Sequence, residues 1–128
     1  MSYRSPLGAV RGLGSAKSGT GHWWQQRLTA LAMIPLVIWF IASILNLLVS
    51  GADHGVVTAW IGQPLVAVLL ILMLGTGFYH MRLGLQVVIE DYVHHEGIKL
   101  ASLVAVTFGA IVLASVTIMS VLQISLGA

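Results

Sequence analysis

The sequence predicts an all-α integral membrane protein with three transmembrane helices. Hydrophobic residues make up 58% of the 128 residues and charged residues only 8%, whereas a soluble domain carries about 25% charged residues. Three apolar runs are each long enough to cross a bilayer, which takes about 20 helical residues. These runs are far too long for strands. We therefore expect lipid, rather than water, to surround most of this chain.

The composition also limits the chemistry that the chain can carry. It contains no cysteine, which excludes a disulfide framework, a thiolate zinc site, covalent haem attachment and iron–sulfur ligation within this chain. A buried redox centre would have to be held by histidine or methionine. The net charge of +2 is too small and too dispersed to indicate a nucleic-acid partner.

The first 21 residues predict a flexible basic arm. Residues 1–21 are rich in glycine and serine, contain Arg4, Arg11 and Lys17, and have no acidic residue. A transit peptide has a similar composition, although any short basic arm does too. We expect the remaining residues, 22–128, to form the membrane domain.

The first apolar span is expected from Leu28 to Val49, with Pro35 inside it, where neighbouring helices can tolerate the lost backbone hydrogen bond. The second span is expected from Pro64, a favourable first-turn residue, to Ile89. The third, from Leu100 to Leu126, carries no charge. The sequence "SGADHG" at 50–55 is typical of a loop, and "EDYVHHEGIK" at 90–99 forms the second connection.

The basic residues predict the orientation. Four of them precede the first span, the connection at 50–63 has none, and the connection after the second span contains Lys99. The positive-inside rule therefore places the N-terminus and the second connection in the cytoplasm and the C-terminus outside. Arg27, Asp91 and Tyr92 would then lie at the same membrane surface.

His80 is a polar side chain inside the second span. Gly77 lies one helical turn before it and Gly84 one turn after it. Two glycines beside a histidine would leave an open shelf for a wide planar ligand such as a porphyrin, and imidazole is a common axial ligand of haem iron. Glycine is equally common where transmembrane helices cross, and a lone histidine can simply bond to a neighbouring helix. Both interpretations remain open at this point.

Arg82 should point about 160° away from His80, because each helical residue advances about 100°. It would either extend toward the membrane surface or pair with an acidic group on a partner. Asp91 falls on the His80 face about 16 Å further along the helix. A tyrosine hydroxyl beside this carboxylate, from Tyr92, could hydrogen-bond to a quinone, or Tyr92 could be only an interfacial anchor.

The segment "GHWWQQRLTA" at 21–30 leads into the first span. Trp23 and Trp24 are typical of an interfacial aromatic belt. Arg27 could form bidentate, charge-assisted hydrogen bonds to the propionate groups of a haem lying between the helices. It could also serve only as a membrane-surface anchor.

Together these features resemble the hydrophobic membrane anchor subunit of succinate dehydrogenase, the D-type subunit of complex II. The resemblance is carried by "HWWQQRLTA" and above all by "HMRLGLQVVIEDYV". It implies that His80 is an axial ligand of haem b and that Tyr92, with Asp91 beside it, binds ubiquinone. It also implies that Arg27 and His22 lie near the haem propionates. With a haem there, the spacing of Gly77 and Gly84 around His80 would let both glycines pack against it.

The resemblance further implies partners. The chain has no iron–sulfur ligands, flavin motif or dicarboxylate site, so it would not be an enzyme alone, and these would belong to an iron–sulfur subunit and a flavoprotein. His80 is the only histidine well inside a span, so a second haem ligand would come from the cytochrome b556 membrane subunit. The two membrane chains would form a heterodimer helix bundle in a bacterial inner membrane or, as an alternative, the mitochondrial inner membrane.

Two other functions remain open on the sequence. One is the anchor of a fumarate reductase, which runs the same chemistry in the opposite direction. The other is a small non-redox transport or assembly component, in which His80 and Arg82 line a polar path.

Overall fold

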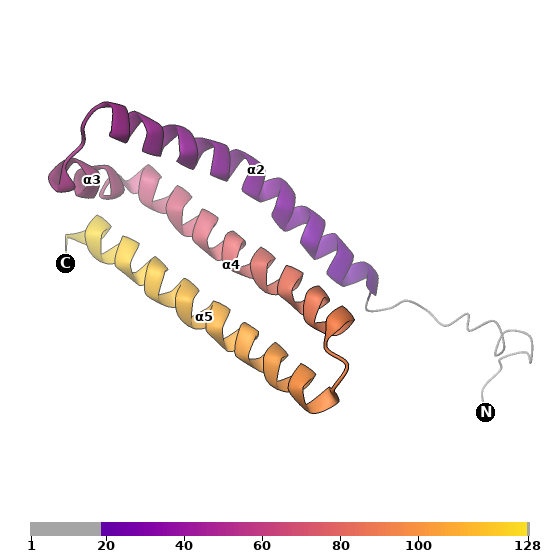
Figure 1. The fold of residues 1–128 in the computed structure, drawn as a ribbon. Coiled ribbons are helices and arrows are strands. Elements are labelled where there is room, and N and C mark those ends of the chain that lie inside the picture. The colour runs from indigo at the N-terminus through magenta and orange to yellow at the C-terminus, as the bar shows by residue number, and fades with distance from the viewer. Residues whose placement is uncertain (1–18, 128) are drawn as a thin grey trace, which may run out of the picture.

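The computed structural model describes residues 19–127, and all the regular elements in this part of the chain are helices. The helices are α2 (Gly19–Val49), α3 (His54–Ile61), α4 (Pro64–Tyr92) and α5 (Glu96–Leu126) (Figure 1). Three of them, α2, α4 and α5, are long and apolar enough to cross a membrane. The prediction of an all-α protein with three spans is therefore confirmed. The basic arm lies outside the described residues, apart from residues 19–21.

Helix α2 begins at Gly19 and not at Leu28, so the polar segment 21–27 is helical. Its 31 residues would extend about 46 Å at 1.5 Å per residue, more than the roughly 30 Å of hydrocarbon in a bilayer. The first turns therefore extend beyond the apolar part of the span. Pro35 lies within the continuous helix.

The connection after α2 is partly helical. The sequence indicated a loop over 50–55, and Gly51 does have a left-handed φ of 67°, but His54 and Gly55 begin the short helix α3. The side chain of Asp53 caps this helix, because its Oδ1 accepts a 2.9 Å hydrogen bond from the Val56 backbone N–H. Such a cap satisfies one of the free N–H groups at a helix start.

Helices α4 and α5 are joined by a tight connection of three residues, Val93–His95. Helix α4 starts with Pro64 in its first turn and continues past Ile89 to Tyr92, so Asp91 and Tyr92 are helical. Helix α5 begins at Glu96 with His95 as its N-cap, whose ring Nδ1 accepts from the Ile98 N–H at 3.4 Å.

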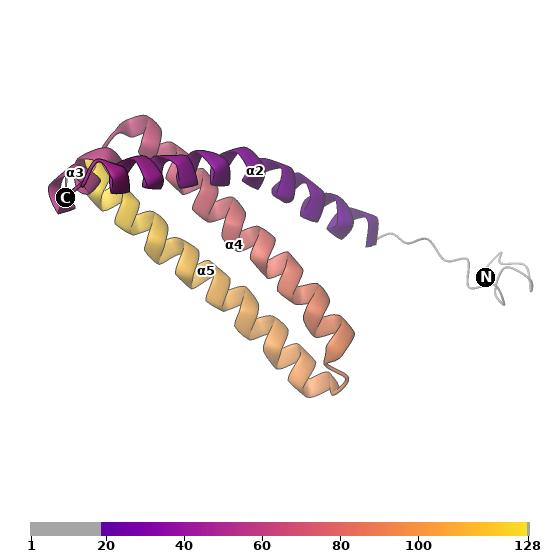
Figure 2. The ribbon, with the colours of Figure 1, turned by 45° about the horizontal axis from the view of Figure 1, so that its top comes forward.

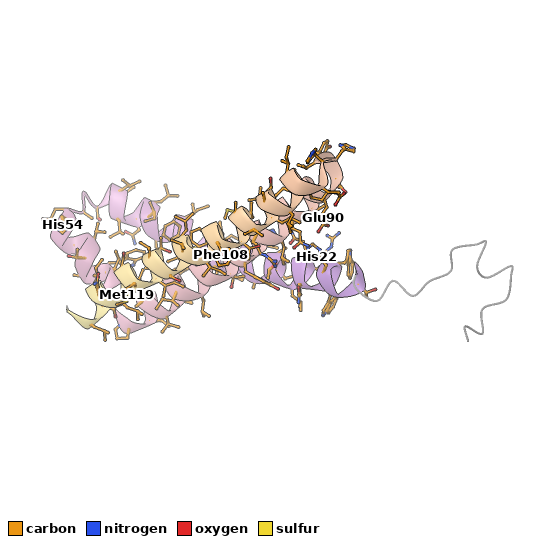
Figure 3. All side chains as sticks on the ribbon, turned by 90° about the horizontal axis from the view of Figure 1, so that it is seen from below. His22, His54, Glu90, Phe108 and Met119 are labelled. Carbon is orange, nitrogen blue, oxygen red and sulfur yellow. The ribbon has the colours of Figure 1, made fainter. Side chains whose placement is uncertain are left out.

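Helix α4 is the central element and packs against both α2 and α5 (Figure 1). A small apolar cluster of Val66, Ala67, Leu70 and Val121 lies toward the α3 end, with Trp39 stacked on Trp60 at a centroid distance of 6.0 Å beside it. Toward the other end, the N-terminal half of α2 diverges from α4 (Figure 2). Figure 3 shows His22 and Glu90 near this second end, and His54 and Met119 near the first.

Candidate functional site

His80 lies on the side of α4 that faces α2. Its Nδ1 is 2.8 Å from the Thr29 Oγ1 of α2, and the contact is partly buried. Helix α4 continues without interruption to Asp91, so the eleven-residue spacing does place Asp91 near the His80 face. Arg82 contacts the opposite neighbour: its Nε donates to Thr107 Oγ1 of α5 at 3.3 Å. The predicted divergence of His80 and Arg82 is therefore confirmed.

The two glycines beside His80 are not equally open. A Cβ added at Gly77 would lie 3.4 Å from Met33 Cε, whereas one at Gly84 would lie 3.6 Å from Gln26 Nε2. The expected open shelf is thus partly covered by side chains of α2, because a glycine allows a neighbouring helix to come close. On the Gly77 side the α2 neighbour is the flexible thioether of Met33, and both residues line a separate apolar groove of about 300 Å³. The free space that borders His80 lies on the Gly84 side.

This free space is a hollow of about 520 Å³ between α2 and α4, which we call the α2–α4 hollow. Helix α4 contributes His80, Gly84 and Val87, and α2 contributes the rest of the lining: Gly19, His22, Trp23, Gln26, Arg27 and Ala30. Four residues predicted from the sequence to surround a cofactor therefore meet around one space: His22, Arg27, His80 and Gly84. Gly77 is not part of this lining.

Two polar atoms in the α2–α4 hollow lack partners. His22 Nε2 and Gln26 Oε1 are buried and make no hydrogen bond within the described part of the chain. A buried polar atom without a partner costs about 1–3 kcal/mol. Nearby, the Arg27 guanidinium lies over the Trp23 ring, with Cζ 5.5 Å from the ring centroid. The lining of the hollow therefore includes the His80 imidazole, two polar atoms without partners and the Arg27 guanidinium.

These residues are suited to a planar apolar group that carries carboxylates. The His80 imidazole can coordinate a metal through the ring nitrogen that does not contact Thr29. Arg27 can bind a carboxylate in a bidentate manner, and the His22 ring and the Gln26 amide can supply further hydrogen bonds. Haem b, with its two propionates, fits this set of donors.

Gln26 was missed by the sequence analysis. It lies one helical turn after His22 and one turn before Thr29 and Ala30, so helical spacing alone puts it on the His22 face. That spacing was the signal that could have identified it. Thr29 was also missed, although the same helical spacing places it on the His22 face.

Asp91 and Tyr92 lie apart from the α2–α4 hollow, at the C-terminal end of α4. Tyr92 is 77% exposed, and its backbone carbonyl lies 3.1 Å from His94 Nδ1. Both residues are exposed at the surface of the described part of the chain. Any ligand that they bind would have to be enclosed by another chain or by lipid.

Arg82 lies on the other side of α4, at a groove of about 390 Å³ between α4 and α5. The groove is otherwise mostly apolar, with Phe78 and Ile111 among its lining residues. Among the described residues no acidic group pairs with Arg82. The salt bridge in this part of the chain joins Lys99 and Glu96, at the start of α5, at 3.2 Å. Its role as a surface-directed side chain or as a partner of an external acid stays a prediction.

Comparisons with known proteins place this chain in a family. The family model described as succinate dehydrogenase/fumarate reductase transmembrane subunit matches residues 1–121. The succinate dehydrogenase hydrophobic membrane anchor subunit of Paracoccus denitrificans is 30% identical over 128 residues, which cover 100% of this chain and 97% of that protein.

Two further relatives have similar names. The succinate dehydrogenase hydrophobic membrane anchor subunit of Rickettsia bellii (strain RML369-C) is 31% identical over 104 residues, covering 81% of this chain and 82% of that protein. The succinate dehydrogenase membrane anchor subunit of Reclinomonas americana is 30% identical over 95 residues, covering 68% and 73%. No solved structure matched the chain. The family match and these relatives confirm the resemblance noted in the sequence: the chain belongs to the succinate dehydrogenase/fumarate reductase transmembrane subunit family.

Proposed function

We propose that this chain is the hydrophobic membrane anchor subunit of a succinate:ubiquinone oxidoreductase. In this role it attaches a flavoprotein and an iron–sulfur subunit to the membrane, shares one haem b with a cytochrome b556 subunit and forms part of the site of ubiquinone reduction. Its family membership and the names of its relatives support the anchor role. The haem and quinone roles rest on the chain's own residues.

The observation that carries the haem proposal is the α2–α4 hollow. His80 would ligate the iron, and Arg27, the His22 ring and the Gln26 NH2 group would bind the propionates. A propionate would give His22 Nε2 the partner that it lacks within the described residues, whereas Gln26 Oε1 accepts and would need a donor from elsewhere. When bound, haem b supplies a one-electron carrier within the membrane. The protein's contribution is to hold the imidazole and to neutralise carboxylate charge near the membrane surface.

The second axial ligand would come from another chain. Besides His80, the chain has four histidines: His22 lines the hollow, His54 lies at the far end of the bundle, and His94 and His95 are in the connection before α5. None of these is at the middle of a span. A six-coordinate iron with two histidine ligands would therefore be shared with the cytochrome b556 subunit, and the two chains together would form a helix bundle.

Tyr92 and Asp91 would contribute to the quinone site. They end α4 at the end of the molecule where α2 begins, as the labels His22 and Glu90 mark in Figure 3. The Tyr92 hydroxyl can donate to a quinone carbonyl, and the Asp91 carboxylate can accept hydrogen bonds from water and relay protons. Its exposure leaves Tyr92 free to meet a quinone held against a neighbouring subunit.

The same end would face the cytoplasm. Arg27 and Lys99 lie there, whereas residues 50–63, at the opposite end, have no Lys or Arg. This orientation would put the quinone residues on the side where soluble subunits dock. Relatives from Rickettsia and Paracoccus are bacterial, so a bacterial inner membrane is the proposed location.

A fumarate reductase anchor is the second candidate, because the family description covers both enzymes. The relatives named as succinate dehydrogenase subunits favour succinate oxidation. A non-redox polar path is disfavoured by geometry. His80 contacts Thr29 on α2 and Arg82 contacts Thr107 on α5, so the two side chains do not line one path within this chain.

The proposal is tested by purifying the native complex from membranes through a tag on this chain. We expect the flavoprotein, the iron–sulfur subunit and a second membrane chain to co-purify. The preparation should show a reduced b-type haem band and should reduce a soluble ubiquinone analogue with succinate. Recovery of the chain without a flavoprotein, or without any haem band, would overturn the proposal. The ratio of succinate oxidation to fumarate reduction in that preparation decides between the two candidates.

A further inference from the structure

We propose that Thr29 is a positioning residue for His80: its hydroxyl selects the tautomer of the imidazole that leaves Nε2 with a free lone pair. The inference rests on the proposed haem function. Thr29 Oγ1 is 2.8 Å from His80 Nδ1, and this contact links α2 to α4 beside the α2–α4 hollow. No other side chain among the described residues hydrogen-bonds to the His80 ring.

The tautomer follows from counting protons at the Thr29 hydroxyl. This oxygen lies 2.8 Å from the Gln25 carbonyl oxygen and 3.1 Å from the Gln26 carbonyl oxygen, in addition to 2.8 Å from His80 Nδ1. A hydroxyl has one proton to donate and two lone pairs that accept. The carbonyl oxygens can only accept, whereas the ring nitrogen can either donate or accept, depending on the tautomer.

Only one assignment satisfies all the close contacts. If Thr29 donated to Nδ1, its oxygen would face the Gln25 carbonyl oxygen at 2.8 Å with no proton between them. If Thr29 instead donates its one proton to the Gln25 carbonyl oxygen, partly shared with that of Gln26, its lone pair accepts from an Nδ1–H of His80, and no two acceptors are left facing each other without a proton. The proton then resides on Nδ1, and Nε2 is the nitrogen that can coordinate a metal.

This arrangement has the form of an outer-sphere contact to a metal ligand. A histidine that binds a metal generally donates its other N–H to an oxygen, which fixes the ring and makes the ligating nitrogen more basic. In lipid there is no water to replace a lost partner. The back-bonded hydroxyl is itself held by α2, so the imidazole is oriented by a helix and not by a mobile loop.

The same face of α2 serves both parts of the site. His22, Gln26 and Thr29 follow one another at intervals of four and three residues, so they lie on one side of the helix. The first two line the α2–α4 hollow and the third contacts the ring. We infer that α2 contributes the hydrogen bonds of the haem site, whereas α4 contributes the metal ligand.

The test compares hydroxyl-bearing and hydroxyl-free variants in the intact complex. Thr29→Val has nearly the shape of threonine but cannot accept from Nδ1–H. A less basic Nε2 stabilises ferric haem less well, so the midpoint potential should rise. A twofold to tenfold change in the reduction equilibrium corresponds to about 20 to 60 mV, at 59 mV per tenfold for one electron. The g-values of the low-spin ferric signal should shift as well, and Thr29→Ser should restore both.

Thr117→Val is the matched control. Thr117 Oγ1 in α5 lies 2.8 Å from the Leu113 carbonyl oxygen and 3.1 Å from that of Ala114, the same two distances as at Thr29. Thr117 has no histidine contact among the described residues, so its replacement by valine removes an equivalent back-bonded hydroxyl without touching His80. The potential of this variant should equal that of the wild type. Thr29→Ala, measured in whole membranes, provides a second hydroxyl-free chain if the valine variant fails to assemble.

The outcomes distinguish a failure of the Thr29 inference from a failure of the assignment of His80 as the haem ligand. If replacing His80 abolishes the low-spin signal but Thr29→Val and Thr29→Ala keep the wild-type potential and g-values, the Thr29 inference is wrong and the haem assignment stands. If the low-spin signal survives the loss of His80 in an assembled complex, the haem assignment itself is wrong. A shift in Thr29→Val that Thr29→Ser does not reverse would also contradict a role for the hydroxyl.

Discussion

The two ring nitrogens of His80 have different surroundings. Nδ1 lies 2.8 Å from the Thr29 hydroxyl, which leaves Nε2 as the nitrogen available to a ligand from outside the chain. The unpartnered His22 Nε2 and Gln26 Oε1 beside it indicate that the same ligand carries hydrogen-bonding groups. At the scale of single residues, the proposed site thus combines an imidazole nitrogen that could bind a metal with a second imidazole that could donate to a carboxylate and an amide oxygen that needs a donor.

Replacing Gly84 by leucine should lower the haem content of the complex. A Cβ at this position would only touch Gln26 Nε2, at 3.6 Å, but the rest of a leucine side chain would fill part of the α2–α4 hollow. Haem per flavin, measured optically, should fall clearly below that of the wild type. Gly75→Leu is the control, because nothing lies within 4 Å of a Cβ there and the residue lines the groove on the α5 side. Normal haem content in Gly84→Leu would contradict this use of the hollow.

Replacing Tyr92 by phenylalanine should slow quinone reduction while sparing assembly. The change removes one exposed hydroxyl, and loss of a net hydrogen bond costs about 0.5–1.5 kcal/mol. Succinate-dependent ubiquinone reduction should fall about threefold to tenfold. Succinate oxidation with an artificial acceptor that bypasses the membrane site should be unchanged in the same preparation.

The matched control for this change is Tyr79→Phe, on the same helix. The Tyr79 hydroxyl donates to Gln25 Oε1 at 3.0 Å, away from the end of α4, so its loss should not lower the rate of quinone reduction selectively. Wild-type quinone reduction in Tyr92→Phe would make Tyr92 only an interfacial anchor. A parallel fall of both activities would indicate an assembly defect instead.

At the scale of elements, the short helix α3 turns the chain from α2 into α4 and is held by its cap and by ring stacking. Asp53 Oδ1 accepts from the Val56 N–H at 2.9 Å, and Trp39 stacks on Trp60. Helix α3 lies at the end of the bundle opposite the α2–α4 hollow, as the labels of His54 and His22 mark in Figure 3. Changes in α3 should therefore alter local stability without altering the proposed haem site.

Replacing Asp53 by alanine should loosen α3. Loss of an N-cap side chain costs about 1 kcal/mol, which is about a fivefold increase in local opening. Hydrogen exchange at the first amides of α3, followed by mass spectrometry, should accelerate by about that factor. The haem spectrum should stay unchanged, and Asp53→Ser should exchange nearly as slowly as the wild type. An equal exchange rate in the alanine variant would show that stacking alone holds the helix.

The long helices could be predicted from the sequence because an apolar run of this length has few alternatives. Their ends could not, because polar residues such as those at 21–27 and 90–92 continue the helix beyond the apolar run. Helix α3 was missed because a helix of eight residues is too short for a periodic signal and because it follows the turn at Gly51.

The individual site residues were largely predictable by type, but not their contacts. His80, Arg27 and His22 stand out as polar groups in or beside apolar spans. The partnership of His80 with Thr29 depends on how α2 is rotated against α4. A helix that faces lipid on most sides has no polar face to reveal that rotation. Spacing could therefore place Gln26 and Thr29 on the His22 face of α2, but it could not show that this face meets His80. The position of Met33 over Gly77 depends on the same rotation of α2 and likewise could not be predicted from the sequence.

At the scale of the whole molecule, the described part of the chain has little interior of its own. Only six hydrophobic side chains are buried in it: Val66, Ala67, Leu70, Leu83, Ala110 and Val121. Large apolar side chains on all three long helices are exposed, and in a membrane protein lipid or a partner helix covers them. One proposed metal ligand on such a surface implies a site completed by a second chain.

The chain made without its membrane partner should therefore contain no haem. Expressed alone, it should be degraded or be recovered in detergent without a b-type spectrum, because His80 supplies one of two axial positions. Co-expression with the second membrane subunit should restore both its abundance and the spectrum. A stable, haem-replete protein obtained from this chain alone would contradict a shared site.

The most direct measurement is the optical spectrum of the tagged complex that carries His80→Leu, compared with His54→Leu as the control at the far end of the bundle. Our account predicts that the low-spin b-type band is lost or markedly altered in the first variant and retained in the second. In both variants the flavoprotein and the iron–sulfur subunit should stay attached and oxidise succinate with an artificial acceptor. An unchanged haem band in an assembled His80→Leu complex would contradict the assignment of His80 as the haem ligand.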